Sequence, residues 1–232
     1  MEDRKTVIIT GANGNLGSAV TKAFLDKGYH VVATVAEQVM LKDMPSADRL
    51  NAFPIDLSKE EETASFIRSQ ILEHGTINGA LLLVGGFAMG NIAATTGQDI
   101  RKQIALNFET AYHVVRPLFA HMMERNAGRI VLIGARPAIN ASQGKNLIAY
   151  GLSKSLLFKL AEFLNEEARG KNVAVAVAAP STLDTQLNRK SMPEANPDDW
   201  VKPQALAEVL EFIISDKASI LREPILKVYN NA

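Results

Sequence analysis

Tyr150 and Lys154 form a pair that could transfer protons. They are four residues apart, so on a helix both side chains lie on one face. An ammonium group beside the phenol would stabilise the phenolate and lower the pKa of Tyr150 from about 10 toward neutrality, where it can exchange a proton. An ordinary surface pair has the same spacing. The position of the pair, at the start of the helix after a fifth strand, favours the chemical interpretation, because ligands bind at the carboxyl ends of such strands.

A glycine-rich turn near the N-terminus predicts a phosphate site. Gly11 and Gly14 would let the backbone turn sharply toward a diphosphate, and Gly17 would let the next helix pack closely on the strand. The unpaired N–H groups at the start of that helix attract negative charge. A plain tight loop is the alternative, and the strand, turn, helix and strand in sequence make it less favoured. We expect the dinucleotide to contact Gly11, Asn13, Gly14, Asn15, Leu16 and Gly17.

Apolar periodicity predicts the elements that position these residues. Strands are expected at 6–9, 31–33, 52–55, 80–84, 129–133, 173–179 and 225–229, and helices from 16, from 58, and at 98–124, 149–168 and 204–215. The stretches 36–51 and 134–148 are expected to be irregular, as is the polar stretch up to 203. This alternation predicts an α/β fold with a doubly wound parallel sheet, Rossmann-like, in one domain spanning 1–232.

Several helices carry more detailed signals. Ser58 and Glu61 suggest a capping box for a helix with Ala64, Ile67, Ile71 and Leu72 inward. The stripe of the 98–124 helix is Ile100, Ile104, Phe108, Ala111, Val115, Leu118 and Met122, and Pro117 could kink it. On the 149–168 helix, Leu152, Leu156, Leu160, Phe163 and Leu164 are expected inward.

Asn107 lies between apolar neighbours on the 98–124 helix, and a buried amide needs partners. It is either a structural hydrogen-bond hub or a site residue. Asp56 ends the third strand, where side chains of this sheet face the ligand. Gly85 and Gly86, after the fourth strand, indicate backbone that lies close to a ligand.

Composition excludes several classes of function. Lys plus Arg equals Asp plus Glu at 25 each, so no basic field favours nucleic acid or an anionic membrane. There is no cysteine, and His30, His74, His113 and His121 lack metal-ligand spacing, so no metal site is expected. With no signal-type segment and no apolar run near 20 residues, a cytoplasmic protein is expected.

Several motifs occur in order along nearly the whole chain: Thr10-Gly11 with Gly17, the helix with Asn107, Tyr150-x-x-x-Lys154, and Pro180 with Thr185. In this order and spacing they resemble the short-chain dehydrogenase/reductases. The resemblance implies that Tyr150 donates a proton, that Lys154 holds the nicotinamide ribose and tunes Tyr150, and that Asn107 orders a water leading to Lys154. It also implies that Asp56 and Leu57 flank the adenine, that Gly85 and Gly86 line the cofactor, and that Pro180, Leu183 and Thr185 hold its carboxamide end.

The chain departs from the family pattern in a way that resembles one subfamily, the dihydropteridine reductases. Gly134-Ala135-Arg136 stands where most of the family has a catalytic serine, Gly85-Gly86-Phe87 follows the fourth strand, and the run from Thr182 through Ala195 to Trp200 is similar. The resemblance implies reduction of a quinonoid dihydropterin, with Phe87, Ala135 and Tyr150 at the substrate and 186–199 as a lid. Phe87 could instead be core packing.

Two other functions stay open: reduction of another ketone or quinone, and a dinucleotide-binding regulator without catalysis. The cofactor is expected to be NAD(P)H. The second strand leads into Thr34-Val-Ala36 and Glu37 without a basic residue, which favours NADH. The apolar excess on the 98–124 and 149–168 helices predicts a homodimer or homotetramer, an assembly usual in the family.

Overall fold

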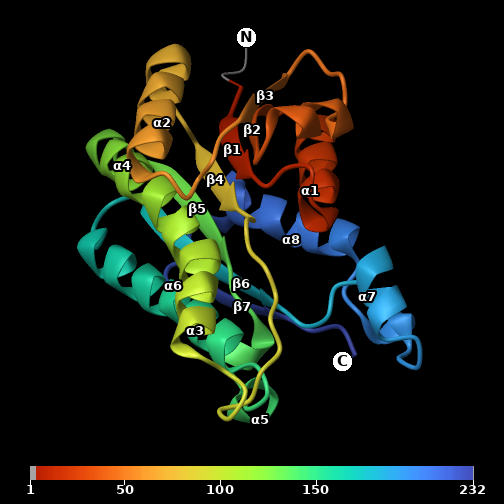
Figure 1. Cartoon of the computed structure of the whole chain (residues 1–232). Helices are drawn as coiled ribbons and strands as arrows, with labels where there is room; N and C mark the ends of the chain where they lie inside the picture. Colours follow the sequence, from red (N-terminus) through yellow and green to blue (C-terminus); the bar gives the residue numbers. More distant parts are fainter. Residues whose placement is uncertain (1–3, 232) are drawn as a thin grey trace.

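Seven short runs rich in β-branched and aliphatic residues form one parallel sheet in the computed structural model, which describes residues 4–231 (Figure 1). The strand order is β3-β2-β1-β4-β5-β6-β7. The order reverses between β1 and β4, and the carboxyl ends of the strands around that point form the ligand crevice of such sheets. The strands are β1 (Thr6–Thr10), β2 (His30–Val35), β3 (Leu50–Pro54), β4 (Gly79–Leu82), β5 (Gly128–Ile133), β6 (Val173–Pro180) and β7 (Ile225–Val228).

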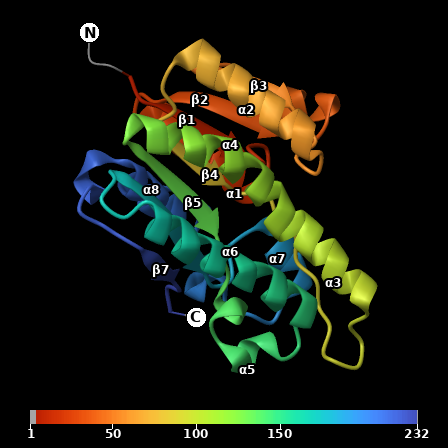
Figure 2. The same ribbon diagram turned by 90° about the vertical axis from the view of Figure 1, so that its left-hand side faces the viewer.

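Helices cover both faces of the sheet, as Figures 1 and 2 show. On one face α1 (Asn15–Asp26) and α8 (Pro203–Ile214) pack on alternate residues of the strands, such as Val7, Ile9 and Val131. On the other face α2 (Glu60–His74), α4 (Thr110–Arg125) and α6 (Ile148–Glu167) pack on the intervening residues, such as Ile8 and Ile130. Burial on both faces explains the continuous apolar runs of the strands and confirms the doubly wound α/β fold.

Three stretches expected to be irregular contain short helices. A 3₁₀ helix, Gln38–Asp43, follows β2, and the 134–148 segment contains the 3₁₀ turn Arg136–Ala138 and α5 (Ala141–Gly144). The polar stretch after β6 contains α7 (Gln186–Ser191) and the 3₁₀ turn Pro197–Asp199. These helices are too short to show a hydrophobic period, so the sequence pattern missed them.

The predicted capping box at Ser58 is wrong. Helix α2 begins at Glu60, and its N-cap residue, Lys59, makes no side-chain cap. The Ser58 hydroxyl instead donates to Asp56 Oδ1 at 2.6 Å. Leu72, predicted inward, is 85% exposed, because the buried face of α2 is formed by Thr63, Phe66, Ile67 and Gln70.

The predicted 98–124 helix is divided by a π-helical turn. Helix α3 (Gly97–Ile104) starts with a capping box made by Thr96 and Asp99, and the π turn Ala105–Glu109 separates it from α4. The turn shifts the register of the helix, so Gln103 and Asn107 are buried, whereas Ile100, Ile104 and Phe108 are only partly buried. The apolar stripe was therefore right for α4. Before α4, Phe108 packs against the core cluster although it is only partly buried, and Ile100 and Ile104 are partly buried.

The inward face of α6 was predicted correctly only in part: Leu160 and Leu164 pack against the core cluster, whereas the other three residues predicted inward are exposed. Leu152 and Phe163 are 51% and 67% exposed, and Leu156 is 37% exposed. The buried residues of α6 are mostly small or polar, with Leu157 the one large apolar side chain among them; they are Ala149, Gly151, Ser153, Lys154, Leu157 and Ala161.

Candidate active site

The turn after β1 provides free backbone donors. Gly11 has φ +63°, a conformation that favours glycine, and its added Cβ would lie 3.1 Å from Val84 Cγ2. The Gly14 N–H donates to Gly11 O at 3.0 Å, which closes the turn. Helix α1 then begins at Asn15, and its N-cap residue, Gly14, has no capping side chain. The first N–H groups of α1 are therefore available to an anion.

Gly17 sets how closely α1 approaches the turn. A Cβ at Gly17 would lie 2.1 Å from Gly11 O and 2.8 Å from Ala12 Cα. Leu16 and Gly17 are buried, and Leu16 packs in the core cluster between α1 and the sheet. These two predicted contact residues therefore shape the turn from within the protein.

A cleft of about 390 Å³ opens beside the turn. It brings together the turn, the ends of β2, β3 and β4, and the α3–α4 segment. Of the predicted cofactor residues, Gly11, Asn13, Asp56 and Leu57 line it. Thr34, Val35 and Ala36, which the sequence placed at the end of the second strand near the cofactor, also line it. The sequence pattern did not assign its other lining residues to the cofactor, and these are Ile55, Ser58, Val84, Lys102, Ala105, Leu106 and Thr110.

Asp56 and Leu57 are held in place from two sides. Asp56 Oδ1 accepts from the Ser58 N–H at 3.0 Å and from the Ser58 hydroxyl, and these bonds lower the pKa of Asp56 below its usual value. His113 Nδ1 lies 2.8 Å from the carbonyl oxygen of Leu57, so this ring nitrogen carries the proton and donates. The end of β3 is thus tied to α4.

Tyr150 lies on the first turn of α6 and Lys154 one turn later, as predicted. The effect expected of Lys154 on the phenol is not found, however. The Lys154 ammonium donates to Ile133 O at 2.8 Å, at the end of β5. Burial raises the pKa of Tyr150 to about 12 and lowers the pKa of Lys154 to about 8. Desolvation therefore sets the direction of both pKa shifts.

Asn107 is completely buried in the π turn. Its Oδ1 accepts from the Gly86 N–H at 2.8 Å, and its Nδ2 donates to Gly86 O at 3.1 Å. Nδ2 also lies 2.9 Å from Gln103 Oε1 and 3.0 Å from Ser153 Oγ. Asn107 is therefore a hydrogen-bond hub that joins the strand-four glycines to α6.

The side chains of Asn107 and Lys154 both lie next to Gly85. A Cβ added to Gly85 would lie 2.6 Å from Asn107 Oδ1 and 3.1 Å from Lys154 Nζ. The sequence pattern did not identify Gln103 and Ser153 as part of this network. Ser153 also donates to Tyr150 O at 2.8 Å. The four-residue step from Gln103 to Asn107, which places both amides on one face of the helix, is the signal that could have revealed the first of them.

Phe87 and Ala135 border Tyr150 and the end of β5. Phe87 is 63% exposed, which excludes the core-packing interpretation, and its ring meets that of Tyr150 edge-on with centroids 5.2 Å apart. Ala135 is buried in extended backbone directly after β5 and Gly134. It has no hydroxyl to offer a substrate.

Pro180, Leu183 and Thr185 lie where β6 ends and leads into α7. Pro180 is the last residue of β6 and pairs with Val228. Leu183 makes a bridge to Val201, and the Thr185 hydroxyl caps α7 by accepting from the Asn188 N–H at 3.1 Å. These three residues do not line the 390 Å³ cleft, and Leu183 packs against the core cluster that includes Ala12 and Leu16 of the turn after β1.

Residues 4–231 contain neither a metal-ligand cluster nor a helix that could span a membrane. Between residues 4 and 231, no three His, Asp or Glu side chains gather where they could hold a metal ion. His30 and His74 are in contact, with ring centroids 4.7 Å apart. Over the same residues, no helix has both the length and the apolar character needed to cross a membrane.

Comparison with known proteins gives consistent matches. A family model described as short chain dehydrogenase matches residues 5–196. The chain is 29% identical over 212 residues to a dihydropteridine reductase of Dictyostelium discoideum, covering 89% of this chain and 86% of the relative. It is 23% identical to a 3-oxoacyl-[acyl-carrier-protein] reductase of Aggregatibacter actinomycetemcomitans, over 97% of each chain. The structure of ElxO with NADP bound superposes with a TM-score of 0.90 at 20% identity, over 97% of each chain.

Proposed function

The chain belongs to the short-chain dehydrogenase/reductase family, and from this premise we propose that it reduces a quinonoid dihydropterin with a nicotinamide dinucleotide. Membership of the family makes it an NAD(P)-dependent oxidoreductase. The observation that carries the choice of substrate is the pairing of an exposed aromatic ring, Phe87, with Tyr150, next to a strand end that has Ala135 in place of a hydroxyl.

The residues of the cleft fit a dinucleotide. The free N–H groups of α1 suit a diphosphate, and the cleft at the ends of β2 and β3 suits an adenosine. The Lys154 ammonium is buried with a carbonyl oxygen as its hydrogen-bond partner, and ribose hydroxyls would give it further acceptors. When bound, the dinucleotide supplies the hydride.

Tyr150 supplies the proton in this proposal. A phenol that burial keeps protonated near neutral pH is ready to donate. The hydride and this proton together convert the quinonoid dihydropterin to the tetrahydropterin and leave NAD(P)+. A conjugated quinonoid imine needs less polarisation than a ketone, so the reaction is compatible with Ala135. Phe87 would stack on the flat pterin ring.

The end of β2 offers no basic side chain to a 2′-phosphate, and this favours NADH as a cofactor. Thr34, Val35 and Ala36 present no charge to the adenosine ribose, and Glu37 follows them. Glu37 is exposed at the start of the 3₁₀ helix and does not line the cleft.

Steady-state oxidation of NADH and of NADPH, with quinonoid dihydropterin regenerated in the assay, tests the proposal. We expect turnover with the pterin and little with simple ketones. Ala135→Ser restores a hydroxyl at the end of β5, and it should raise activity on ketones relative to the wild type. If the protein binds dinucleotides but reduces ketones or quinones and no pterin, the pterin assignment is wrong.

We also propose that the protein assembles through α6. Its outer face exposes Leu152, Leu156 and Phe163, and Tyr112 of α4 is 38% exposed. Burying such side chains against a second copy would remove a large apolar area from water. Light scattering of the purified protein should give the mass of a dimer or tetramer. A Leu152→Glu, Phe163→Glu variant should be monomeric, and a monomeric wild type would contradict the proposal.

A further inference from the structure

The cleft at the end of β2 is lined by one positively charged side chain among the described residues. This side chain belongs to Lys102 on α3, on the side of the cleft opposite β2. Among the described residues that line the cleft, Lys102 carries the one positive side chain and Asp56 the one negative side chain. Lys102 lies on α3, whereas Thr34, Val35 and Ala36 form the end of β2. The sequence pattern predicted a helix at 98–124, which includes Lys102, but it gave no sign that this residue lies near the ends of the strands.

The end of β2 lacks the group that would repel a second phosphate. In this fold a carboxylate at that position accepts hydrogen bonds from the ribose hydroxyls and disfavours a 2′-phosphate. Here the position is neutral, and Glu37 lies outside the cleft lining. A 2′-phosphate would therefore meet no fixed negative charge on this wall.

The Lys102 ammonium has no carboxylate partner at ion-pair distance within residues 4–231. The nearer acid is Asp99, whose Oδ2 accepts from the Thr96 N–H at 2.9 Å and from the Thr96 hydroxyl in the cap of α3. The positive charge of Lys102 contributes to the lowered pKa of Asp99. Asp56, the acidic residue in the cleft, already accepts two hydrogen bonds from Ser58. Lys102 is thus exposed and free to bind an anion in the cleft.

We propose that Lys102 binds the 2′-phosphate of NADPH, so that the enzyme accepts NADPH as well as NADH. The inference rests on the proposed function, since it needs a dinucleotide in this cleft. The phosphate is then recognised from α3, three residues before the π turn that begins at Ala105, and not from the end of β2. A charge-assisted bond between the ammonium and the phosphate provides the discrimination.

Calorimetric titration tests this role without any need for turnover. The probes are NADP+, NAD+, adenosine 2′,5′-bisphosphate and AMP, and the variant is Lys102→Gln. We expect the variant to bind NADP+ and the bisphosphate about 10-fold or more weakly, because a charge-assisted bond to phosphate is lost. Binding of NAD+ and AMP should change by less than about twofold, because neither has the 2′-phosphate.

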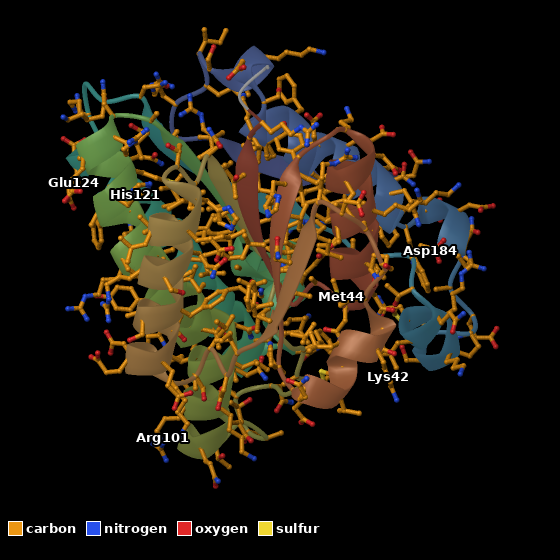
Figure 3. The ribbon with its side chains drawn as sticks, turned by 90° about the horizontal axis from the view of Figure 1, so that it is seen from above. Lys42, Met44, Arg101, His121, Glu124 and Asp184 are labelled. Atoms are coloured by element: carbon orange, nitrogen blue, oxygen red, sulfur yellow. The ribbon has the colours of Figure 1, made fainter. Side chains whose placement is uncertain are left out.

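Two matched controls use cations that the structure places elsewhere. Arg101 is the neighbouring residue on α3 and lies at the periphery of the molecule, and Lys42 lies on the segment that follows β2 (Figure 3). Neither lines the cleft. Arg101→Gln and Lys42→Gln should leave all four affinities nearly unchanged. A selective loss of NADP+ binding in Lys42→Gln would assign the role to Lys42 and overturn the inference.

The remaining outcomes separate this inference from the proposed function. If the wild type binds NAD+ but binds NADP+ more than about 100-fold less tightly, Lys102 does not hold a 2′-phosphate, and the proposed function stands. An equal loss for all four probes in Lys102→Gln also contradicts the inference. If the wild type binds neither dinucleotide, the proposed function itself fails.

Discussion

Replacing Tyr150 with phenylalanine is expected to lower kcat by about 10²- to 10⁴-fold, the usual contribution of a general acid. The phenol is the titratable hydroxyl on the first turn of α6, beside Phe87. Its pKa, raised to about 12 by burial, keeps the proton on the oxygen at neutral pH until the substrate takes it. Phenylalanine keeps the ring and its contact with Phe87, so binding of NAD+ should stay within about twofold while turnover is lost.

Tyr112→Phe is a matched control for Tyr150→Phe. Tyr112 is also on a helix of this face, but it is 38% exposed and stacks on Phe108. Its loss of a hydroxyl should leave kcat within about twofold. If Tyr150→Phe keeps more than about a tenth of the wild-type kcat, the proton comes from another group or from water.

Gly17→Ala is expected to destabilise the protein by about 3 kcal/mol, the upper part of the range for overpacking. The added methyl group would lie 2.1 Å from the carbonyl oxygen of Gly11, and it meets backbone atoms that no side-chain rotation can move. For a chain of this length, the loss corresponds to a fall in Tm of about 6–12 °C. Helix α1 must also move away from the turn, so affinity for NAD+ should fall at least about tenfold.

Gly14→Ala separates this effect from a general intolerance of the turn. Gly14 has φ −70°, which any residue can adopt, and its added Cβ would meet one atom, Gly11 O, at 3.2 Å. Its unfolding free energy should change by less than about 1 kcal/mol. Thermal and urea unfolding of both variants measure the difference. Equal Tm values for the two would show that α1 can shift at little cost.

The sheet and the glycine-rich turn after β1 were predictable because their causes are local. Gly11 and Gly17 are needed at fixed steps from β1, and strands buried on both faces produce apolar runs that mark them directly. The spacing of Tyr150 and Lys154 also gave their common face correctly. In each case, neighbours in the sequence determine the result.

The errors arose where tertiary surroundings decide. The pKa of Tyr150 depends on its burial and on where Lys154 points, and Lys154 points to Ile133 O. The exposure of Leu152 and Phe163 depends on how closely α6 approaches the sheet. The place of Lys102 in the cleft lining depends on α3 lying opposite the end of β2. None of these relations has a period or a spacing in the sequence.

Because the π turn Ala105–Glu109 separates α3 from α4, the number of residues in this segment determines which side chains face the site. Successive residues of an α-helix are rotated by about 100°, so one residue more or less turns everything on one side of the change by that angle. Deleting a residue here would let α3 and α4 join as one regular helix and carry Asn107 away from Gly86, or α3 away from the cleft. Homologous enzymes that differ freely in their surface loops should therefore show no insertions or deletions across these five residues.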